Sequence, residues 1–327
     1  MSALTDRYGR RFPYLRLSVI PACNFRCTYC LPDGYHADPG APRALSLAEI
    51  TRLLSGFVAL GMQKLRITGG EPSVRRDLTA ILRTAAAVPG VEKLAMTTNG
   101  TLLTRRLPEW MDAGLNAINV SIDSLDRANF ARITGRDTLD SILEGVDMAL
   151  AARMPSVKLN VVLMRGVNDD ELPTWLDYLR EHDVGVRFIE LMQTGDNLEF
   201  FRRHHLRAEG LETELREQGW TQIPRAIDAG PAREYHHPAF AGRIGIIAPY
   251  SKDFCAGCNR LRVTATGDLR LCLFGEFGIP LRHLLQADEQ REDLVHAIGG
   301  QIGRKEKGHF LHQGRTGVTP HLASTGG

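Results

Sequence analysis

Three cysteines lie close together near the start of the chain, and their spacing is suited to binding a metal centre. Cys23, Cys27 and Cys30 are separated by three and then two residues. Three thiolates on one short loop can bind three irons of a [4Fe–4S] cube, and the fourth iron then stays open to a small molecule. A structural zinc site with His36 as fourth ligand is the alternative. The spacing favours the cluster, because zinc sites usually combine two pairs of ligands.

The other three cysteines of the chain form a second triad of similar spacing. Two residues separate Cys255 from Cys258, and thirteen separate Cys258 from Cys272. An iron–sulfur cluster and a zinc site both fit this pattern, and His283 or a histidine at 236 or 237 could complete the zinc site. A disulfide framework fits poorly, because a chain of 327 residues can bury a large core without cross-links. The first triad favours iron–sulfur chemistry here too.

Composition limits the classes of protein to which the chain can belong. The hydrophobic share of 43% and the charged share of 24% are ordinary for a soluble globular protein. No apolar run is long enough to cross a membrane and no secretory signal is recognisable, so we expect a cytoplasmic protein that binds no membrane. The formal net charge of +2 argues against a broad nucleic-acid-binding surface.

Short β-prone runs alternate with helical patterns over the first part of the chain. Strands that alternate with helices predict a parallel sheet, and six such units indicate an incomplete (β/α)6 barrel of the TIM type. The clearest helix begins after Ser46, where Glu49 completes a capping box, and it ends at Gly61. The six predicted strands are Tyr14–Ile20, Lys64–Thr68, Lys93–Thr98, Ala117–Ile122, Val157–Leu163 and Gly185–Glu190.

The pattern changes after residue 195. Residues 196–240 are polar, and short β-prone runs follow near Ile244–Ile247 and Leu261–Thr264. Helices are predicted near Ile279–Gln286 and Glu289–Ile302. We therefore expect a barrel over residues 1–195 and a C-terminal extension over residues 196–327, which would carry the second cysteine triad.

Polar residues gather where the predicted strands end. Ligands bind at this edge in parallel α/β folds. Ordinary strand-ending turns use the same residue types, but several of them beside a cysteine loop favour a binding site. The segments are Gly69-Gly70-Glu71-Pro72, Thr97-Thr98-Asn99-Gly100 and Ser121-Ile122-Asp123.

The cysteine loop, with Tyr29 before its last cysteine, and the Gly-Gly-Glu-Pro turn resemble the radical S-adenosylmethionine (SAM) superfamily. Three further features resemble one family within it, the GTP 3′,8-cyclases of molybdopterin biosynthesis. They are the second triad, the run Asn259-Arg260-Leu261-Arg262, and the terminal Gly326 and Gly327. The resemblance extends over nearly the whole chain.

The resemblance implies roles for individual residues. Each triad would hold one [4Fe–4S] cluster, and Gly326 and Gly327 would enter the barrel and act in catalysis. Arginine suits a triphosphate, because its forked guanidinium matches phosphate oxygens. SAM would be bound by Tyr29, Gly70, Ser121 and Met192, and GTP by Arg16, Arg66, Thr97, Lys158, Arg260, Leu261 and Arg262.

The resemblance also implies a reaction and partners. An external electron donor would drive cleavage of SAM to a 5′-deoxyadenosyl radical, which removes hydrogen from C3′ of GTP. Bonding of C3′ to C8, a second reduction and a proton would complete the cyclised nucleotide. A homodimer and a downstream cyclic pyranopterin monophosphate synthase are expected. The alternatives are a peptide-modifying radical SAM enzyme with an auxiliary cluster, and a non-catalytic sensor of iron or redox state.

Overall fold

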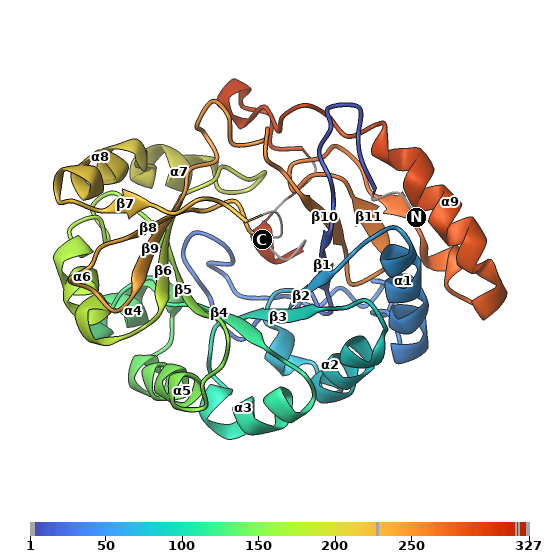
Figure 1. Ribbon diagram of the computed structural model, residues 1–327, viewed down its shortest axis with the longest axis horizontal. Coiled ribbons are helices and arrows are strands. Elements are labelled where there is room, and N and C mark those ends of the chain that lie inside the picture. The colour runs from blue at the N-terminus through green and yellow to red at the C-terminus, as the bar shows by residue number, and fades with distance from the viewer. Residues whose placement is uncertain (1–3, 227–228, 318, 320, 325–327) are drawn as a thin grey trace.

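The computed structural model describes residues 4–226, 229–317, 319 and 321–324, and a curved sheet with helices outside it dominates the fold (Figure 1). The strands follow the order β12-β11-β10-β1-β2-β3-β4-β5-β6-β9-β8-β7. Their bounds are β1 Tyr14–Ser18, β2 Lys64–Thr68, β3 Lys93–Thr98, β4 Ala117–Ser121, β5 Val157–Leu163, β6 Gly185–Glu190, β7 Thr221–Gln222, β8 Arg233–His236, β9 Arg243–Ile247, β10 Arg260–Val263, β11 Asp268–Arg270 and β12 Ile279–Pro280.

The prediction of a partial barrel of parallel strands is confirmed. Strands β1 to β6 pair in parallel in chain order. The bounds of β2, β3, β5 and β6 are as predicted, whereas β1 and β4 end slightly earlier. Two strands from the C-terminal region extend the parallel sheet, with β10 beside β1 and β9 beside β6. In the described part of the chain β9 and β10 do not pair with each other, so the barrel stays open there.

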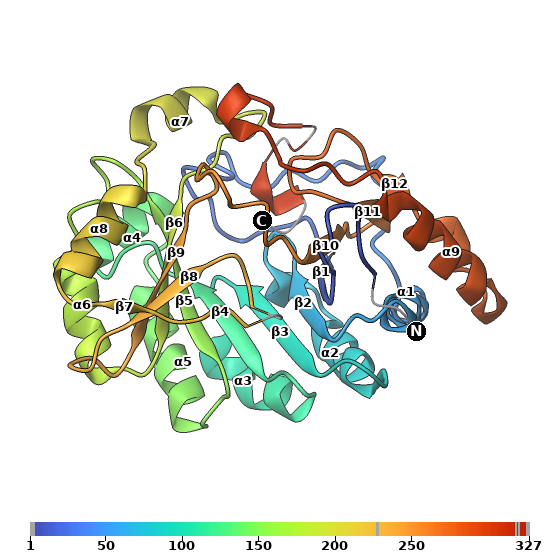
Figure 2. The ribbon, with the colours of Figure 1, turned by 45° about the horizontal axis from the view of Figure 1, so that its top comes forward.

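Helices cover the outer surface of the barrel (Figures 1 and 2). The capping box that begins α1 is present, because Ser46 N donates to Glu49 Oε2 at 2.8 Å and Glu49 N donates to Ser46 Oγ at 3.3 Å. The helices are α1 Leu47–Ala59, α2 Leu78–Ala87, α3 Leu103–Asp112, α4 Arg127–Thr134, α5 Leu139–Ala151, α6 Leu172–Glu181, α7 Leu198–His204, α8 Glu209–Glu217 and α9 Arg291–Ile302. None of the helices in the described part combines the length and apolar character needed to span a bilayer.

One predicted helix is wrong. Residues 279–286 contain the strand β12, which pairs antiparallel with β11, and then a single 3₁₀ turn over Arg282–Leu284. Pairing of Ile279 and Pro280 with β11 holds the start of this segment in an extended conformation. A proline is tolerated at the end of the sheet, where β12 lies.

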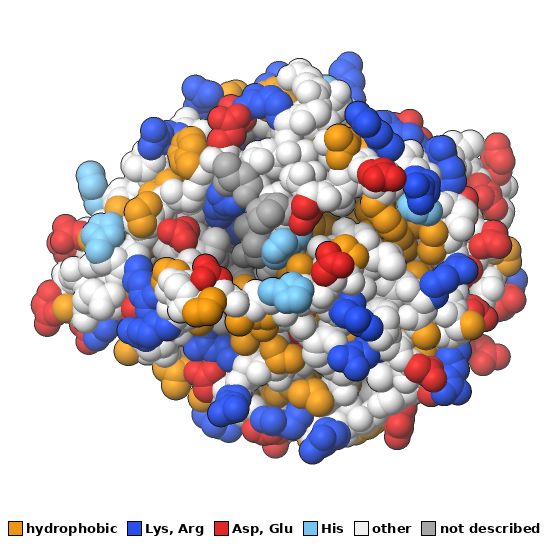
Figure 3. Space-filling view, turned by 180° about the vertical axis from the view of Figure 1, so that it is seen from behind, with side chains coloured by type: hydrophobic (Ala, Val, Ile, Leu, Met, Phe, Trp, Pro, Cys, Tyr) orange, Lys and Arg blue, Asp and Glu red, His pale blue; other side chains and the backbone are white. Residues whose placement is uncertain are grey.

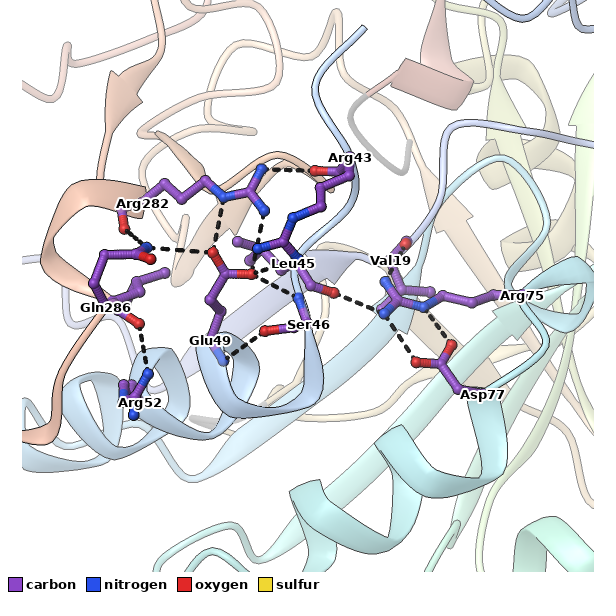
Figure 4. A network of polar contacts seen from close by, with 11 residues as sticks. Val19, Arg43, Leu45, Ser46, Glu49, Arg52, Arg75, Asp77, Arg282 and Gln286 are labelled. Carbon is purple, nitrogen blue, oxygen red and sulfur yellow. Dashed lines mark hydrogen bonds and ion pairs between the residues drawn. The ribbon is translucent and has the colours of Figure 1, made fainter.

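A buried carboxylate connects the C-terminal region to the barrel (Figure 4). Glu49 on α1 is 3% exposed, and Arg282 Nε donates to its Oε1 at 2.8 Å. Gln286 Nε2 donates to the same oxygen at 3.3 Å. Next to this network, α9 packs on α1 so closely that a Cβ on Gly56 would lie 2.6 Å from Leu294 Cδ2. The boundary at residue 195 stays a prediction, since the later strands join the same sheet.

Candidate active site

Two adjoining cavities lie inside the barrel, and each is lined by one cysteine triad. We name them the first-triad cavity, lined by Cys23, Cys27 and Cys30, and the second-triad cavity, lined by Cys255, Cys258 and Cys272. Asn160, Ile189 and Met192 line both cavities. A ligand in one cavity would therefore lie next to a ligand in the other.

The Gly-Gly-Glu turn after β2 supports the backbone just before the first triad. Gly70 N donates to Ile20 O at 2.9 Å, and Glu71 N donates to Ala22 O at 2.8 Å. A Cβ on Gly70 would lie 2.4 Å from Ala22 O, so no other residue type fits without moving the loop. The glycine thus allows the close approach of two backbone segments, which fixes the start of the cysteine loop.

The Glu71 side chain connects this turn to the end of β3. It is 1% exposed, and its Oε1 accepts from Thr98 Oγ1 at 2.8 Å and from Ser73 N at 2.9 Å. Its Oε2 accepts from Asn99 N at 2.6 Å. A buried carboxylate needs such donors, because burial raises its pKa. Two of the predicted polar segments are therefore held together by one side chain.

All four residues predicted to bind SAM line the first-triad cavity, namely Tyr29, Gly70, Ser121 and Met192. The Tyr29 hydroxyl donates to Asp123 Oδ2 at 3.0 Å. Val162 N donates to Asp123 Oδ1 at 2.8 Å, and burial raises the pKa of this carboxyl to about 6. Asp123 also lines the cavity, although only its place after the fourth strand had suggested a role.

The second-triad cavity is strongly cationic. No Asp or Glu of the described residues lines it. Strand register explains part of the cluster, because Arg16 on β1 lies between Arg66 on β2 and Arg262 on β10. A cavity with this excess of positive charge is suited to a polyanion such as a triphosphate. The cations that line it are Arg16, Lys64, Arg66, Arg187, Arg260, Arg262 and Lys305.

Four of the residues predicted to bind GTP line this cavity, namely Arg16, Arg66, Arg260 and Arg262. Thr97 instead lines the first-triad cavity, where its Oγ1 accepts from Arg66 Nη1 at 3.2 Å. Thr97 therefore lies where the two cavities meet.

Lys158 and Leu261 are placed differently from the other predicted residues. Lys158 Nζ lies 2.5 Å from Glu234 Oε1, and the lysine lines a separate depression. The side chain of Leu261 is 1% exposed in the hydrophobic core, because it alternates with Arg260 and Arg262 along β10. The structure thus does not bring the Leu261 side chain into either cavity.

The residues missed by the sequence analysis include Tyr14, Lys64, Arg187 and Lys305, which all line the second-triad cavity. The sequence contained a pattern that could have indicated three of them. Tyr14, Lys64 and Arg187 alternate with buried apolar residues along β1, β2 and β6, so they share one face of the sheet, and buried charged side chains are unusual. Lys305 follows α9 and is brought into the cavity only by tertiary packing.

The cysteine environments fit metal-bound thiolates. All six cysteines are free thiols. Burial raises the pKa of Cys27 well above its ordinary value and that of Cys30 to about 12, so these thiols need a bound cation to ionise. Burial alone would also raise the pKa of Cys258, but Lys305 and Arg260 lower it to about 6. Soft thiolates in two groups of three suit iron–sulfur clusters. Within the described residues, no three His, Cys, Asp or Glu side chains surround a single metal-ion position.

The C-terminal segment reaches the first triad. Leu322 and Ala323 line the first-triad cavity, and their backbone N–H groups hydrogen bond to the Cys30 thiol. The segment before them is held by Thr319, whose carbonyl accepts from Gly195 N at 3.0 Å and whose hydroxyl donates to Leu273 O at 2.5 Å. The red ribbon of residues 321–324 lies inside the curve of the sheet in Figures 1 and 2. Gly326 and Gly327 lie outside the described residues.

The outer surface offers no comparable concentration of one charge on the face shown in Figure 3. Basic and acidic side chains are interspersed there. Several basic side chains are paired, as Arg127 is with Asp137 at 2.7 Å and Arg203 with Glu199 at 3.2 Å. On this face, basic side chains do not gather as they do in the second-triad cavity.

Comparisons with known proteins match the whole chain. Residues 17–179 match the family model of the Radical SAM superfamily, and residues 184–311 match that of Molybdenum Cofactor Synthesis C. A GTP 3′,8-cyclase of Stenotrophomonas maltophilia (strain K279a) is 64% identical over 327 residues, which cover 100% of both chains. A GTP 3′,8-cyclase of Yersinia pestis is 51% identical over 100% of both chains.

Solved structures show a similar fold at much lower sequence identity. Streptococcus suis SuiB bound to S-adenosylmethionine superposes with a TM-score of 0.58 at 13% identity. The match covers 87% of this chain and 68% of that one. This likeness concerns the fold alone.

Proposed function

We propose that this chain, which belongs to the GTP 3′,8-cyclase family of the radical SAM superfamily, converts GTP to (8S)-3′,8-cyclo-7,8-dihydroguanosine 5′-triphosphate. The observation that carries the proposal is the pairing of the two cavities. One is cationic and contains the second cysteine triad, and the other adjoins it and contains the first. A nucleoside triphosphate in the cationic cavity would place its ribose near SAM in the other.

The second-triad cavity accounts for binding of the triphosphate. Arg16, Arg66 and Arg262 lie side by side on adjacent strands, so their guanidinium groups can contact successive phosphates. Arg260 lies near the second triad, with its guanidinium 5.9 Å from the ring centroid of Phe254. We infer that the phosphates lie on the side of β1 and β2 and that the guanine base lies against the triad.

The boundary between the cavities accounts for positioning of the ribose. Ile189 and Met192 line both cavities with apolar side chains, which exclude water from the place where a carbon radical would react. Asn160 provides the shared polar group. When an iron–sulfur cluster is bound to the first triad, reductive cleavage of SAM supplies the 5′-deoxyadenosyl radical. The protein then has to hold C3′ of GTP within reach of it.

Further partners belong to the proposal. The chemistry needs an external electron donor. The product would pass to a cyclic pyranopterin monophosphate synthase in the synthesis of the molybdenum cofactor. A homodimer, a cytoplasmic location and a boundary between barrel and extension near residue 195 are part of the same proposal.

The test is turnover under strict exclusion of oxygen. Protein reconstituted with iron and sulfide should contain about eight irons per chain, and GTP with SAM and a reductant should give the cyclised nucleotide by mass spectrometry. The variant with Cys255, Cys258 and Cys272 all changed to Ser should keep about half of the iron and lose cyclisation. Cleavage of SAM without change in GTP would indicate a different radical SAM enzyme. Stoichiometric zinc, or no SAM cleavage, would contradict the proposal and favour a metal-binding sensor.

A further inference from the structure

Tyr14 lies in the middle of the cationic cavity and is not used by the function proposed above. It is on β1, is 3% exposed and lines the second-triad cavity. Arg66 Nε donates to the Tyr14 hydroxyl oxygen at 2.6 Å, and Arg16 also hydrogen bonds to it. The Lys64 ammonium lies 4.7 Å from the centroid of the Tyr14 ring. Three cations thus contact one buried phenol.

Charged groups face Tyr14 from every strand packed around it. Arg16 belongs to its own strand, Lys64 and Arg66 to β2, Arg260 and Arg262 to β10, and Arg187 to β6. Arg260 lies directly beside Tyr14 in the strand register. The acidic side chain of Glu234 contacts this group, with its Oε1 2.8 Å from Arg187 Nη2. Apart from the cysteines, Tyr14 is the only described lining residue that can become an anion.

These neighbours change the acidity of the phenol. Burial would raise the pKa of Tyr14, but Arg66, Arg16 and Lys64 outweigh it and lower the pKa to about 6. Before a polyanion binds, the phenolate therefore partly balances the surrounding cations at neutral pH. A phosphate that contacts the same cations brings its own negative charge, and the phenolate then faces a like charge.

We propose that Tyr14 is a substrate-positioning residue whose hydroxyl takes up a proton when the triphosphate binds and then donates a hydrogen bond to a phosphate oxygen. The proton comes from the buffer, and no covalent bond changes. Because the expected ligand is the triphosphate of GTP, this inference rests on the proposed function. The geometry that supports it is the shared position of the phenol oxygen and the phosphate-binding cations.

The proposal has a pH dependence of definite sign. Because Tyr14 takes up a proton when GTP binds, GTP affinity falls as pH rises above about 6, which is the pKa of Tyr14 before binding. The ionisation of GTP itself changes the affinity of wild type and of Tyr14→Phe equally, so the ratio of the two affinities reports the contribution of Tyr14 alone. Near about pH 6.5 the wild type should bind roughly tenfold more tightly, the loss expected for one hydrogen bond to a charged group. The ratio should then fall by a factor approaching ten per pH unit.

The first experiment measures GTP binding calorimetrically on anaerobically reconstituted protein, from about pH 6.5 to 8.5. Two buffers of different protonation enthalpy report the number of protons taken up. Wild type should take up close to one proton more than Tyr14→Phe. The control is Tyr8→Phe, which changes a tyrosine that is 42% exposed and should take up as many protons as wild type. Equal proton numbers and a ratio independent of pH would overturn the inference while GTP binding itself survives. Failure of wild type to bind GTP would instead overturn the proposed function.

The second experiment needs no variant. Inorganic tripolyphosphate is transparent in the near ultraviolet, so a difference spectrum can follow the tyrosinate band of wild type directly. At about pH 8, saturating tripolyphosphate should remove a tyrosinate signal equivalent to about one residue. Binding without this loss would overturn the inference, and so would tripolyphosphate that fails to compete with GTP.

Discussion

Arg10 Nη1 donates a hydrogen bond to the carbonyl oxygen of Cys255 at 3.1 Å, although the two residues are 245 positions apart. The same guanidinium donates to Lys307 O at 3.0 Å and to Glu306 O at 2.7 Å. Asp6 Oδ2 accepts from Arg10 Nε at 2.7 Å and fixes its orientation. The N-terminal segment therefore holds both the turn of the second triad and the loop that presents Lys305.

Arg10→Ala should release the second cluster while the first is kept. The change leaves backbone carbonyls around Cys255 without their donor, so the turn no longer has a fixed position. Iron in anaerobically reconstituted protein should fall from about eight toward about four per chain. Arg11→Ala, an exposed neighbour, is the control and should keep full iron. Full iron in Arg10→Ala would show that the contact is not needed.

Arg262→Ala should weaken GTP binding by about 1.5–3 kcal/mol, the range for a hydrogen bond to a charged group. Arg262 is 8% exposed and lines the second-triad cavity, and it is not among the described residues that line the first-triad cavity. SAM binding should therefore stay close to wild type in equilibrium titrations. Arg243→Ala, on the exposed side of β9, is the matched control. An equal loss for both ligands would indicate a folding defect.

Removal of Gly326 and Gly327 should abolish cyclisation and leave iron content and the melting temperature near wild type. The last described residues support this expectation, since Leu322 and Ala323 already lie in the first-triad cavity beside Cys30. Glycine can enter a space too narrow for a side chain, so changing both residues to Ala should have a similar effect. Turnover at the parent rate by the truncated protein would show that the tail is dispensable.

Glu49→Gln should destabilise the protein by about 1.5–3 kcal/mol at neutral pH, because it removes the charge that Arg282 and Gln286 contact. Burial opposes ionisation of Glu49, but Arg282 and Ser46 lower its pKa to about 2. A lowered folded-state pKa gives stability that is complete above the unfolded value near 4.5 and is lost as pH falls toward 2. Urea unfolding should therefore give a constant difference from about pH 5 to 8.

Exposed Glu144 on α5 provides the control for Glu49. Glu144→Gln should change stability by less than about 0.5 kcal/mol. A Glu49→Gln protein as stable as this control would mean that the connection between α1 and the C-terminal region contributes nothing measurable.

The sequence was sufficient to predict the inner strands, because each is a short apolar run between turn residues. It was not sufficient to place β9 and β10 in the same sheet, since strands that pair at a distance, as Tyr14 does with Arg260 and Gly185 with Arg243, leave no local pattern. The same limit applies to the site. Cys23, Cys27 and Cys30 are recognisable from their spacing, whereas Lys305 and Tyr14 meet in one cavity only after folding. The Asn-Arg-Leu-Arg motif predicted that Leu261 binds GTP together with Arg260 and Arg262. Side chains alternate along a strand, however, so the side chain of Leu261 lies in the hydrophobic core.

The most direct test of the account follows hydrogen from GTP to SAM. GTP carrying deuterium at C3′ is incubated with SAM, a reductant and the anaerobically reconstituted protein, and 5′-deoxyadenosine is analysed by mass spectrometry. Each 5′-deoxyadenosine formed should carry one deuterium, and an equal amount of cyclised nucleotide should have lost it. Unlabelled 5′-deoxyadenosine, with the GTP recovered unchanged, would contradict it.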